Sequence, residues 1–411
     1  MKEKTTQTKK NIPKGWKEVR LGDVIEKIID YRGKTPKKLG GDWCSKGYRA
    51  ISARSIKNGK LVNEDKMNLL SEDLYRKWMK DEIQFGDIIL TSEAPLGEHL
   101  IWKSNEKIVL SQRVFAIRTN RKILNPFYFN HFIDSRYFQH ELKSRQSGTT
   151  VTGIRQTELL KTKILLPPLS EQKAIAEVLS SLDDKIDLLH RQNKTLENIA
   201  QALFRKWFID EADDGWEERS FVDFFDFLEG PGIRNWQYTE SGTRFINIRL
   251  IQNGEIKTEK ANFVSDQEAN GKYKHFLLKE KDMIVSTSGT LGKTAIIRKY
   301  HLPLMLNTSV IRFRPKDGVN YSFVYQYLQS KQFREDLENY GGGSVQKNFG
   351  PTHLRMMKFR LPPAKLLENF RRHADNLYIK LDKNYLQIRT LENLRDILLP
   401  KLMGGELRVR F

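Results

Sequence analysis

The sequence has very little cysteine and no long apolar run. Its 411 residues include a single cysteine, Cys44, which excludes a disulfide framework and a cluster of thiolate metal ligands. No apolar stretch approaches the roughly 20 residues that span a bilayer. The first residues, MKEKTTQTKKN, have no apolar centre of the kind that a secretory signal carries. The sequence therefore predicts a soluble, cytoplasmic protein.

Acidic residues are also in short supply. The chain has 51 Asp and Glu against 71 Lys and Arg, a formal net charge of +20. The excess positive charge lies mainly in residues 15–168 and 215–363, and nearly neutral segments follow both blocks. With 39% hydrophobic residues, the chain can form packed cores, and its length suits two or three domains. Nucleic acid is the default partner for such a basic protein.

The chain contains two copies of one sequence pattern. A nearly constant offset of 195 residues aligns GYRAISARSIKNG (47–59) with GTRFINIRLIQNG (242–254). The same offset aligns Leu-Pro-Pro at 166–168 with Leu-Pro-Pro at 361–363. A single register that holds over such distant segments indicates a tandem duplication.

Each copy is expected to be a mixed α/β body. Asn-Gly pairs favour hairpin turns, and runs such as Ile88-Ile89-Leu90 and Met283-Ile284-Val285 are typical of strands. Asn125-Pro126 predicts the start of one helix that continues past Leu142, and its counterpart begins at Asn320. A Pro-Pro pair, which no helix crosses, then marks the domain edge. The predicted fold class is α+β.

A long helix is predicted after each Pro-Pro pair, over residues 169–208 and 364–403. Ser170 is expected to cap the first helix, and Pro400 with Gly404-Gly405 to end the second. Apolar residues follow strict 4-3 spacing along both helices, which is the pattern of a coiled-coil seam. The central seam positions are Leu182, Ile186, Leu189, Asn193 and Leu196 in the first helix, and Leu377, Leu381, Asn384, Ile388 and Leu391 in the second.

One asparagine interrupts each seam. Antiparallel pairing of the two helices about their midpoints places Asn193 opposite Asn384. A polar residue in an apolar seam costs stability unless it meets a partner, and such a pair fixes the register. We therefore predict an intramolecular antiparallel coiled coil in which the two amides meet. The alternative is that both asparagines lie at a frayed, hydrated edge.

The antiparallel arrangement predicts a spacing between the two basic blocks. Each block enters its helix at the N-terminal end, and about 33 residues at ~1.5 Å each would separate the blocks by roughly 50 Å. One turn of B-DNA is about 34–36 Å. The sequence thus favours a target with two half-sites, about one to one and a half turns apart.

Candidate DNA contacts are polar and basic residues in loops beside strand ends, where phosphates and base edges can be reached. These loops differ between the copies, as in Ser-Glu-Ala-Pro against Thr-Ser-Gly-Thr, so we expect the two half-sites to differ. The candidates in copy one are Lys34, Lys37, Lys38, Arg49, Ser52, Arg54, Ser92, Gln112, Arg113, Thr149, Thr150 and Arg155. Those in copy two are Arg234, Trp236, Arg244, Asn247, Arg249, Ser286, Thr287, Asn307, Thr308, Ser344, Gln346, Lys347 and Asn348.

No set of residues makes a convincing catalytic or metal site. Asn125-Pro126-Phe127-Tyr128 is similar to the Asn-Pro-Pro-Tyr motif of adenine aminomethyltransferases, but it lacks the second proline and a glycine-rich cofactor loop. The segment 287–294 imitates a phosphate loop without its first glycine, so a tight turn is the simpler interpretation. The eight histidines show no metal-ligand spacing. We expect no catalysis, no metal and no cofactor in this chain.

Several motifs together resemble the specificity subunit of type I restriction-modification systems. They are Gly15-Trp16-Lys17-Glu18, Leu21-Gly22-Asp23-Val24, Ser147-Gly148-Thr149-Thr150 and LPPLSEQKAIA (166–176), and the resemblance covers both copies. It implies two target recognition domains, 15–168 and 215–363, separated by conserved helices. Residues 1–14 are expected to form a disordered tail. The resemblance also implies docking of two methyltransferase subunits and, through them, of restriction-translocase subunits. S-adenosylmethionine, ATP and magnesium would belong to those partners.

Copy two departs from the family pattern, because Leu366-Leu367 stands where copy one has Glu171-Gln172. If Glu171 and Gln172 serve partner docking, the second docking site departs from the family pattern. The expectation is a non-catalytic subunit whose two domains read an asymmetric bipartite DNA site across a spacer set by the coiled coil. The alternatives are a self-contained DNA methyltransferase or nuclease, and a nucleic-acid-binding scaffold without sequence preference.

Overall fold

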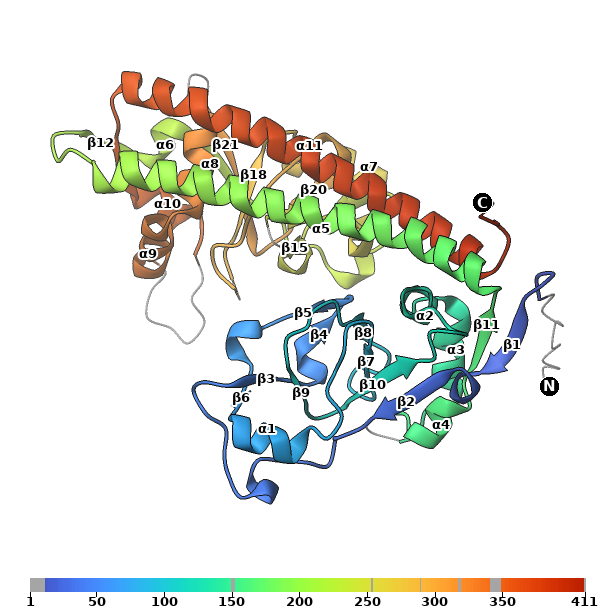
Figure 1. Ribbon diagram of the computed structural model, residues 1–411. Helices are drawn as coiled ribbons and strands as arrows, with labels where there is room; N and C mark the ends of the chain where they lie inside the picture. The colour runs from blue at the N-terminus through green and yellow to red at the C-terminus, as the bar shows by residue number, and fades with distance from the viewer. Residues whose placement is uncertain are drawn as a thin grey trace. The chain divides into compact units, whose positions relative to one another are not determined.

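The computed structural model describes residues 12–148, 152–252, 254–288, 290–316, 319–340 and 349–409. The chain divides into two compact units, unit 1 (residues 1–188 with 389–411) and unit 2 (residues 189–388). Each unit combines a mixed α/β body with part of both long helices, α5 (Leu169–Arg205) and α11 (Ala364–Met403) (Figure 1). A search of the described residues finds no helix with the length and apolar character that crossing a membrane requires.

The body of unit 1 is built on a four-stranded antiparallel sheet with the order β2-β10-β7-β8. Successive residues of a strand point to opposite faces: Ile88 and Leu90 join one hydrophobic cluster, and Ile89 joins the other. The strands are β1 (Lys17–Arg20), β2 (Ile25–Ile29), β3 (Tyr48–Ile51), β4 (Ile56–Lys57), β5 (Lys60–Leu61), β6 (Leu69–Leu70), β7 (Ile88–Thr91), β8 (His99–Ile101), β9 (Val109–Leu110), β10 (Val114–Thr119) and β11 (Lys163–Leu166), and the short helices are α1 (Glu72–Trp78), α2 (Pro126–Ile133), α3 (Arg136–Ser144) and α4 (Gln156–Leu160).

The body of unit 2 repeats this architecture. Its main sheet has the order β13-β21-β18-β19, which matches the main sheet of unit 1 strand for strand. The strands are β12 (Glu217–Ser220), β13 (Phe225–Glu229), β14 (Thr243–Phe245), β15 (Ile251–Gln252), β16 (Glu255–Ile256), β17 (Asn262–Val264), β18 (Met283–Ser286), β19 (Thr294–Ile296), β20 (Leu304–Met305), β21 (Val310–Pro315) and β22 (Lys358–Leu361), and the short helices are α6 (Phe221–Phe224), α7 (Asp266–Asn270), α8 (Tyr321–Gln329), α9 (Lys331–Tyr340) and α10 (Pro351–Met356).

The same ion pair recurs in both units, and its aspartate is buried in each. In unit 1, Arg118 Nη2 lies 2.6 Å from Asp87 Oδ2, and both side chains are almost fully buried. In unit 2, Arg314 Nε lies 2.6 Å from Asp282 Oδ1. Because a buried carboxylate must be paired, this recurring pair accounts for two aspartates that the repeat aligns.

The long helices pair antiparallel in each unit. In unit 1, Arg395 Nη1 of α11 lies 3.1 Å from Asp183 Oδ1 of α5. In unit 2, Asn384 Nδ2 donates a 2.8 Å hydrogen bond to Asn193 Oδ1, and both residues are buried. The predicted coiled coil is therefore present, and its asparagines meet. Of the other central seam residues, Ile186, Leu189, Leu381 and Ile388 are buried, and Leu182, Leu196, Leu377 and Leu391 are half-buried.

Two details of the predicted helices were wrong. The single helix expected after Asn125 is two helices, α2 and α3, because Ser135 Oγ accepts from the Phe138 amide and caps a new helix. Helix α5 begins at Leu169, so Ser170 lies in its first turn and does not cap it. Helix α11 has the predicted bounds, Ala364–Met403, and it tolerates Pro400 because the ring lies near the end, where only the last turn loses a donor.

Several predicted features lie partly or wholly outside the described residues. Of the tail, only residues 12–14 are described, and the Pro13 carbonyl accepts from the Trp16 amide. The other features are Asn253, the centre of the phosphate-loop imitation at Gly289, and the polar loops at 149–151 and 341–348.

Candidate nucleic-acid interface

In unit 1, the polar loops meet at the ends of β7 and β10. The Ser92 amide donates to the Arg113 carbonyl (2.8 Å), and the Ile154 amide donates to the Ser92 carbonyl (2.9 Å). These main-chain bonds draw three loops, around residues 92, 113 and 154, to one edge of the sheet. We call this arrangement the strand-end frame.

Unit 2 contains the same strand-end frame. The Thr287 amide donates to the Ser309 carbonyl (2.9 Å), and the Phe349 amide donates to the Thr287 carbonyl (3.2 Å). Arg113 and Ser309 also share a left-handed backbone, with φ of +65° and +73°. Since main-chain bonds hold the frame, its side chains can change without loss of the loop geometry.

Exposed polar side chains surround the frame of unit 1. Gln112, Arg113, Arg54 and Arg155 are exposed. Arg113 Nε lies 3.1 Å from Glu93 Oε1, and the Ala53 amide donates to the Gln112 carbonyl, which brings half-buried Ser52 beside them. The structure thus gathers candidates from four separate loops.

Glu93 was missed by sequence reasoning, which considered only basic and neutral polar contacts. A carboxylate can accept a hydrogen bond from the amino group of cytosine. Glu93 directly follows the candidate Ser92 in the sequence, and this position could have identified it.

Two candidates of unit 1 are engaged elsewhere. Arg49 forms ion pairs with Glu64 and Glu106, which neutralise its charge. Lys34 lies over the Tyr31 ring at 4.4 Å and donates to the Trp78 carbonyl, and burial lowers the pKa of its ammonium group. Lys37 and Lys38 of the same segment remain exposed.

Three frame residues are buried, which corrects their assignment as surface contacts. Ser92, Ser286 and Thr287 have at most 3% of their surface exposed. Ser286 Oγ donates to the Thr290 carbonyl (2.6 Å) and accepts from the Lys293 amide (2.9 Å). The Ser286 side chain therefore shapes its own loop.

The candidates of unit 2 divide into an exposed group and a supporting group. Arg234, Trp236, Arg249 and Thr308 are exposed. The supporting group comprises Arg244, whose guanidinium lies 5.8 Å from the Phe263 ring, Asn247, which accepts from the Arg249 amide, and Asn307, which accepts from the Thr308 amide. Thr149, Thr150, Ser344, Gln346, Lys347 and Asn348 lie outside the described residues.

The structure contradicts the docking role expected for Glu171 and Gln172. Both side chains are buried in unit 1. Glu171 accepts from Trp16 Nε1 (3.2 Å) and Arg408 Nη2 (2.7 Å). Gln172 accepts from the Asn125 amide (2.8 Å), and its Nε2 lies 2.9 Å from each of two main-chain carbonyls. Both groups hold the start of α5 in place, so their polar atoms are not available to a partner.

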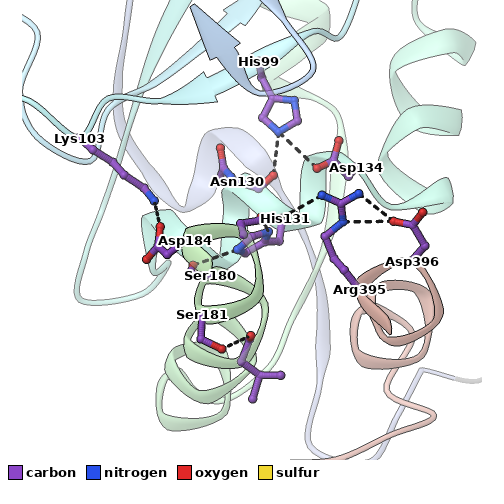
Figure 2. Close-up of polar contacts among 12 residues, drawn as sticks. His99, Lys103, Asn130, His131, Asp134, Ser180, Ser181, Asp184, Arg395 and Asp396 are labelled. Carbon is purple, nitrogen blue, oxygen red and sulfur yellow. Dashed lines mark hydrogen bonds and ion pairs between the residues drawn. The ribbon is translucent and has the colours of Figure 1, made fainter. Parts of the chain in front are cut away.

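A polar cluster joins the body of unit 1 to α5, and Arg395 of α11 pairs with Asp183 of α5 beside it. Figure 2 shows His99 beside Asn130, with His99 Nε2 2.9 Å from the Asn130 carbonyl, and His131 beside Ser180, with His131 Nε2 3.0 Å from Ser180 Oγ. The exposed pair of Lys103 and Asp184, 2.8 Å apart, flanks these contacts. A further contact places His131 Nδ1 3.8 Å from Asp183 Oδ2.

The described residues contain no group of three or more His, Cys, Asp or Glu side chains that could hold a metal ion. The histidines of unit 1 just described instead make structural contacts between the body and the helices.

Comparison with known proteins shows the family to which the chain belongs. The family model for the type I restriction modification DNA specificity domain matches residues 13–198 and 213–368, one match for each copy. The chain belongs to this family. Members of the family are DNA-recognition components of restriction-modification systems and not enzymes, and this holds for the present chain.

Relatives in the specificity-subunit family extend over almost the whole chain. The MjaVIII specificity subunit of Methanocaldococcus jannaschii is 24% identical and the alignment covers 97% of this chain and 94% of the relative. The HindI specificity subunit of Haemophilus influenzae is 23% identical over 95% of this chain and 99% of the relative. The crystal structure of the S subunit from M. genitalium has a TM-score of 0.57 with 17% identity, and 98% of each chain is covered. The predicted fold class is thereby confirmed.

Proposed function

We propose that this specificity subunit selects an asymmetric bipartite DNA site, with each unit reading one half. The observation that carries the proposal is the strand-end frame, which recurs with the same main-chain bonds in both units. The exposed side chains of the frame loops differ, with Gln112 and Arg113 in unit 1 and Thr308 in unit 2. One frame with two sets of side chains suits two half-sites of different sequence.

The exposed basic side chains are proposed to position the duplex. Arg54, Arg113 and Arg155 in unit 1, and Arg234 with Arg249 in unit 2, are exposed. Contacts from arginine to phosphate supply affinity, and contacts to base edges supply specificity. DNA in the cytoplasm is the proposed substrate of the complex.

Exchange of one body tests the proposal. Residues 15–168 would be replaced by the corresponding segment of a related specificity subunit, in cells that supply the partner subunits. We expect one half of the modified site to change and the other half and the gap to stay the same. Sequencing of modified bases in host DNA provides the measurement. A change in both halves would show that the units do not read DNA independently.

The outer faces of the long helices are proposed to dock two methyltransferase subunits. Large apolar side chains remain exposed there, outside the seam. Leu394 and Ile397 of α11 lie in unit 1, and Ile199 of α5 with Ile379 of α11 lie in unit 2. Exposed apolar patches of this kind mark protein interfaces. In this proposal, the methyltransferase subunits supply S-adenosylmethionine, and restriction-translocase subunits recruited through them use ATP and magnesium.

Charged substitutions on these faces test the docking proposal. Leu394→Glu with Ile397→Glu should remove one methyltransferase subunit, and Ile199→Glu with Ile379→Glu should remove the other, because each buried apolar side chain contributes about 1.5–3 kcal/mol. The mass of the purified complex would fall by one subunit in each case. Gln201→Glu, an exposed substitution that removes no apolar surface, is the control. Full assembly of both double variants would contradict the proposal.

A further inference from the structure

A short exposed tip projects from unit 2 between two buried residues. Ile233 and Gln237 are buried, whereas Arg234, Asn235 and Trp236 between them are exposed. Trp236 lies in the single turn η6 (Asn235–Gln237), and 80% of its surface is exposed. Trp236, the largest apolar side chain in this segment, is therefore packed very little against the rest of the chain.

The tip is held firmly by its two ends. Gln237 Nε2 donates to Glu268 Oε1 (2.9 Å) and to the Tyr273 hydroxyl (3.0 Å), and Gln237 Oε1 accepts from the Arg234 amide (3.1 Å). Ile233 packs in a hydrophobic cluster that includes Tyr273. The backbone that carries the exposed Trp236 is therefore anchored at both ends, which lowers the backbone entropy lost when the indole binds.

The tip adjoins the strand-end frame of unit 2. The Thr308 amide donates to the Pro231 carbonyl (3.1 Å). At Gly230 the two segments approach so closely that a Cβ atom would lie 2.3 Å from the Asn307 carbonyl oxygen. Trp236 is thus attached, through a few well-anchored residues, to the edge that is proposed to read DNA.

Unit 1 presents no comparable aromatic group in the described part of its corresponding segment. Its tryptophan there, Trp43, is half-buried, with its ring centroid 6.1 Å from that of Trp78. The exposed residues of that segment include Lys37 and Lys38. The two units therefore offer different chemistry beside equivalent frames.

We propose that Trp236 stacks on a base face at a distorted step within the half-site of unit 2. Base faces are covered in a regular duplex, so an indole gains a partner only where a step opens, either around an apolar wedge or beside a base that has left the stack. Arg234, two residues away, then lies within reach of a neighbouring phosphate. This inference rests on the proposed function, because it assumes that unit 2 reads a half-site.

Binding measurements on the full chain, assembled with its modification subunits, test this role. The probe is a duplex of the host's modified site with 2-aminopurine placed in turn at each position of both half-sites. For Trp236→Ala we expect affinity to fall about 5- to 100-fold, as for the loss of one base–aromatic stack. Trp236→Phe should keep most of the affinity, and Ile209→Ala, another exposed apolar residue of unit 2, should keep all of it.

The 2-aminopurine signal locates the contact. With the native chain and Trp236→Phe, fluorescence should change at one step of the half-site read by unit 2. That change should be absent with Trp236→Ala, while signals in the other half-site stay the same.

Three outcomes would overturn the inference. The first is native affinity of Trp236→Ala for the bipartite site, and the second is an equal loss on duplexes that lack the second half-site. The third is unchanged DNA binding with weaker assembly of the modification subunits, which would identify a protein contact. Failure of the native complex to prefer any bipartite site would instead refute the proposed function, whatever the behaviour of Trp236→Ala.

Discussion

His131, in the polar cluster of unit 1, is a single residue whose protonation depends on pH. It is buried, and desolvation lowers the pKa of its imidazole to about 4, although Asp183 opposes the shift. His99, Lys103 and Arg395 also face it and lower the pKa further. At the equivalent position, unit 2 has Gln326, whose Nε2 donates to the Tyr378 hydroxyl (2.6 Å). Unit 1 therefore has a titratable side chain, His131, where unit 2 has the neutral side chain of Gln326.

The lowered pKa of His131 predicts acid sensitivity. The unfolded chain binds a proton near the ordinary pKa of about 6.5, and the folded chain only near 4, so stability is lost as pH falls through this range. The loss attributable to His131 is on the order of 3 kcal/mol. His131→Gln, which copies unit 2, should reduce the difference in Tm between pH 7.5 and pH 5.

A matched control for this prediction is His140→Gln, which changes an exposed histidine of α3. It should leave the pH dependence of Tm as it is in the native chain. An equal pH dependence in the native chain and in His131→Gln would show that the burial of His131 does not cause the acid sensitivity.

At the scale of elements, the paired asparagines determine how α5 and α11 align. The 2.8 Å bond between Asn384 and Asn193 is buried among apolar seam residues such as Leu189 and Leu381. Tyr385 adds a hydroxyl bond to Glu197 (3.1 Å) one position along. Shifting either helix by a turn would leave these polar groups facing apolar side chains, which disfavours other registers.

Substitution of the asparagine pair measures its contribution. Asn193→Leu alone leaves the Asn384 amide without this partner and should cost about 1–3 kcal/mol of unfolding free energy. The double change Asn193→Leu with Asn384→Leu should restore most of the loss, since an apolar pair needs no hydrogen bond. Thermal unfolding of the full chain gives both values, with the exposed Asn198→Leu as control. Equal losses for the single and double variants would show that the pair does not act as a pair.

At the scale of the whole molecule, continuous helices connect the two DNA-reading bodies. Helix α5 contributes residues to both units, and so does α11. We propose that the length of these helices sets the gap between the half-sites.

Insertion of one heptad into both helices tests whether their length sets the gap between the half-sites. Equal insertions beside the asparagine pair keep the seam in phase and add about 10 Å, since each residue rises about 1.5 Å. The gap in the modified site should widen by about three base pairs, while both half-sites stay unchanged. Modified-base sequencing of host DNA would show the new gap. A constant gap with altered half-sites would contradict the proposal that helix length sets the gap. An insertion into α5 alone serves as the comparison, because it separates Asn193 from Asn384 and should lower Tm.

The duplication, the four-three seam and the meeting of Asn193 with Asn384 could all be predicted from sequence alone. Local rules also predicted the cap at Asn125, whose side chain accepts from the Phe127 and Tyr128 amides, and the hairpin at Asn58-Gly59, where both residues have positive φ. These features depend on periodicity and on bonds between near neighbours, which a sequence displays directly.

Only the tertiary structure decided which polar residues are exposed. Glu171 is buried because Arg408, 237 positions away, folds against it, and Ser92 is buried where the distant Ile154 amide donates to its carbonyl. The same long-range contacts leave Trp236 exposed at the tip that Ile233 and Gln237 anchor. The physical reason is that burial results from segments distant in sequence coming together, which neither composition nor spacing records.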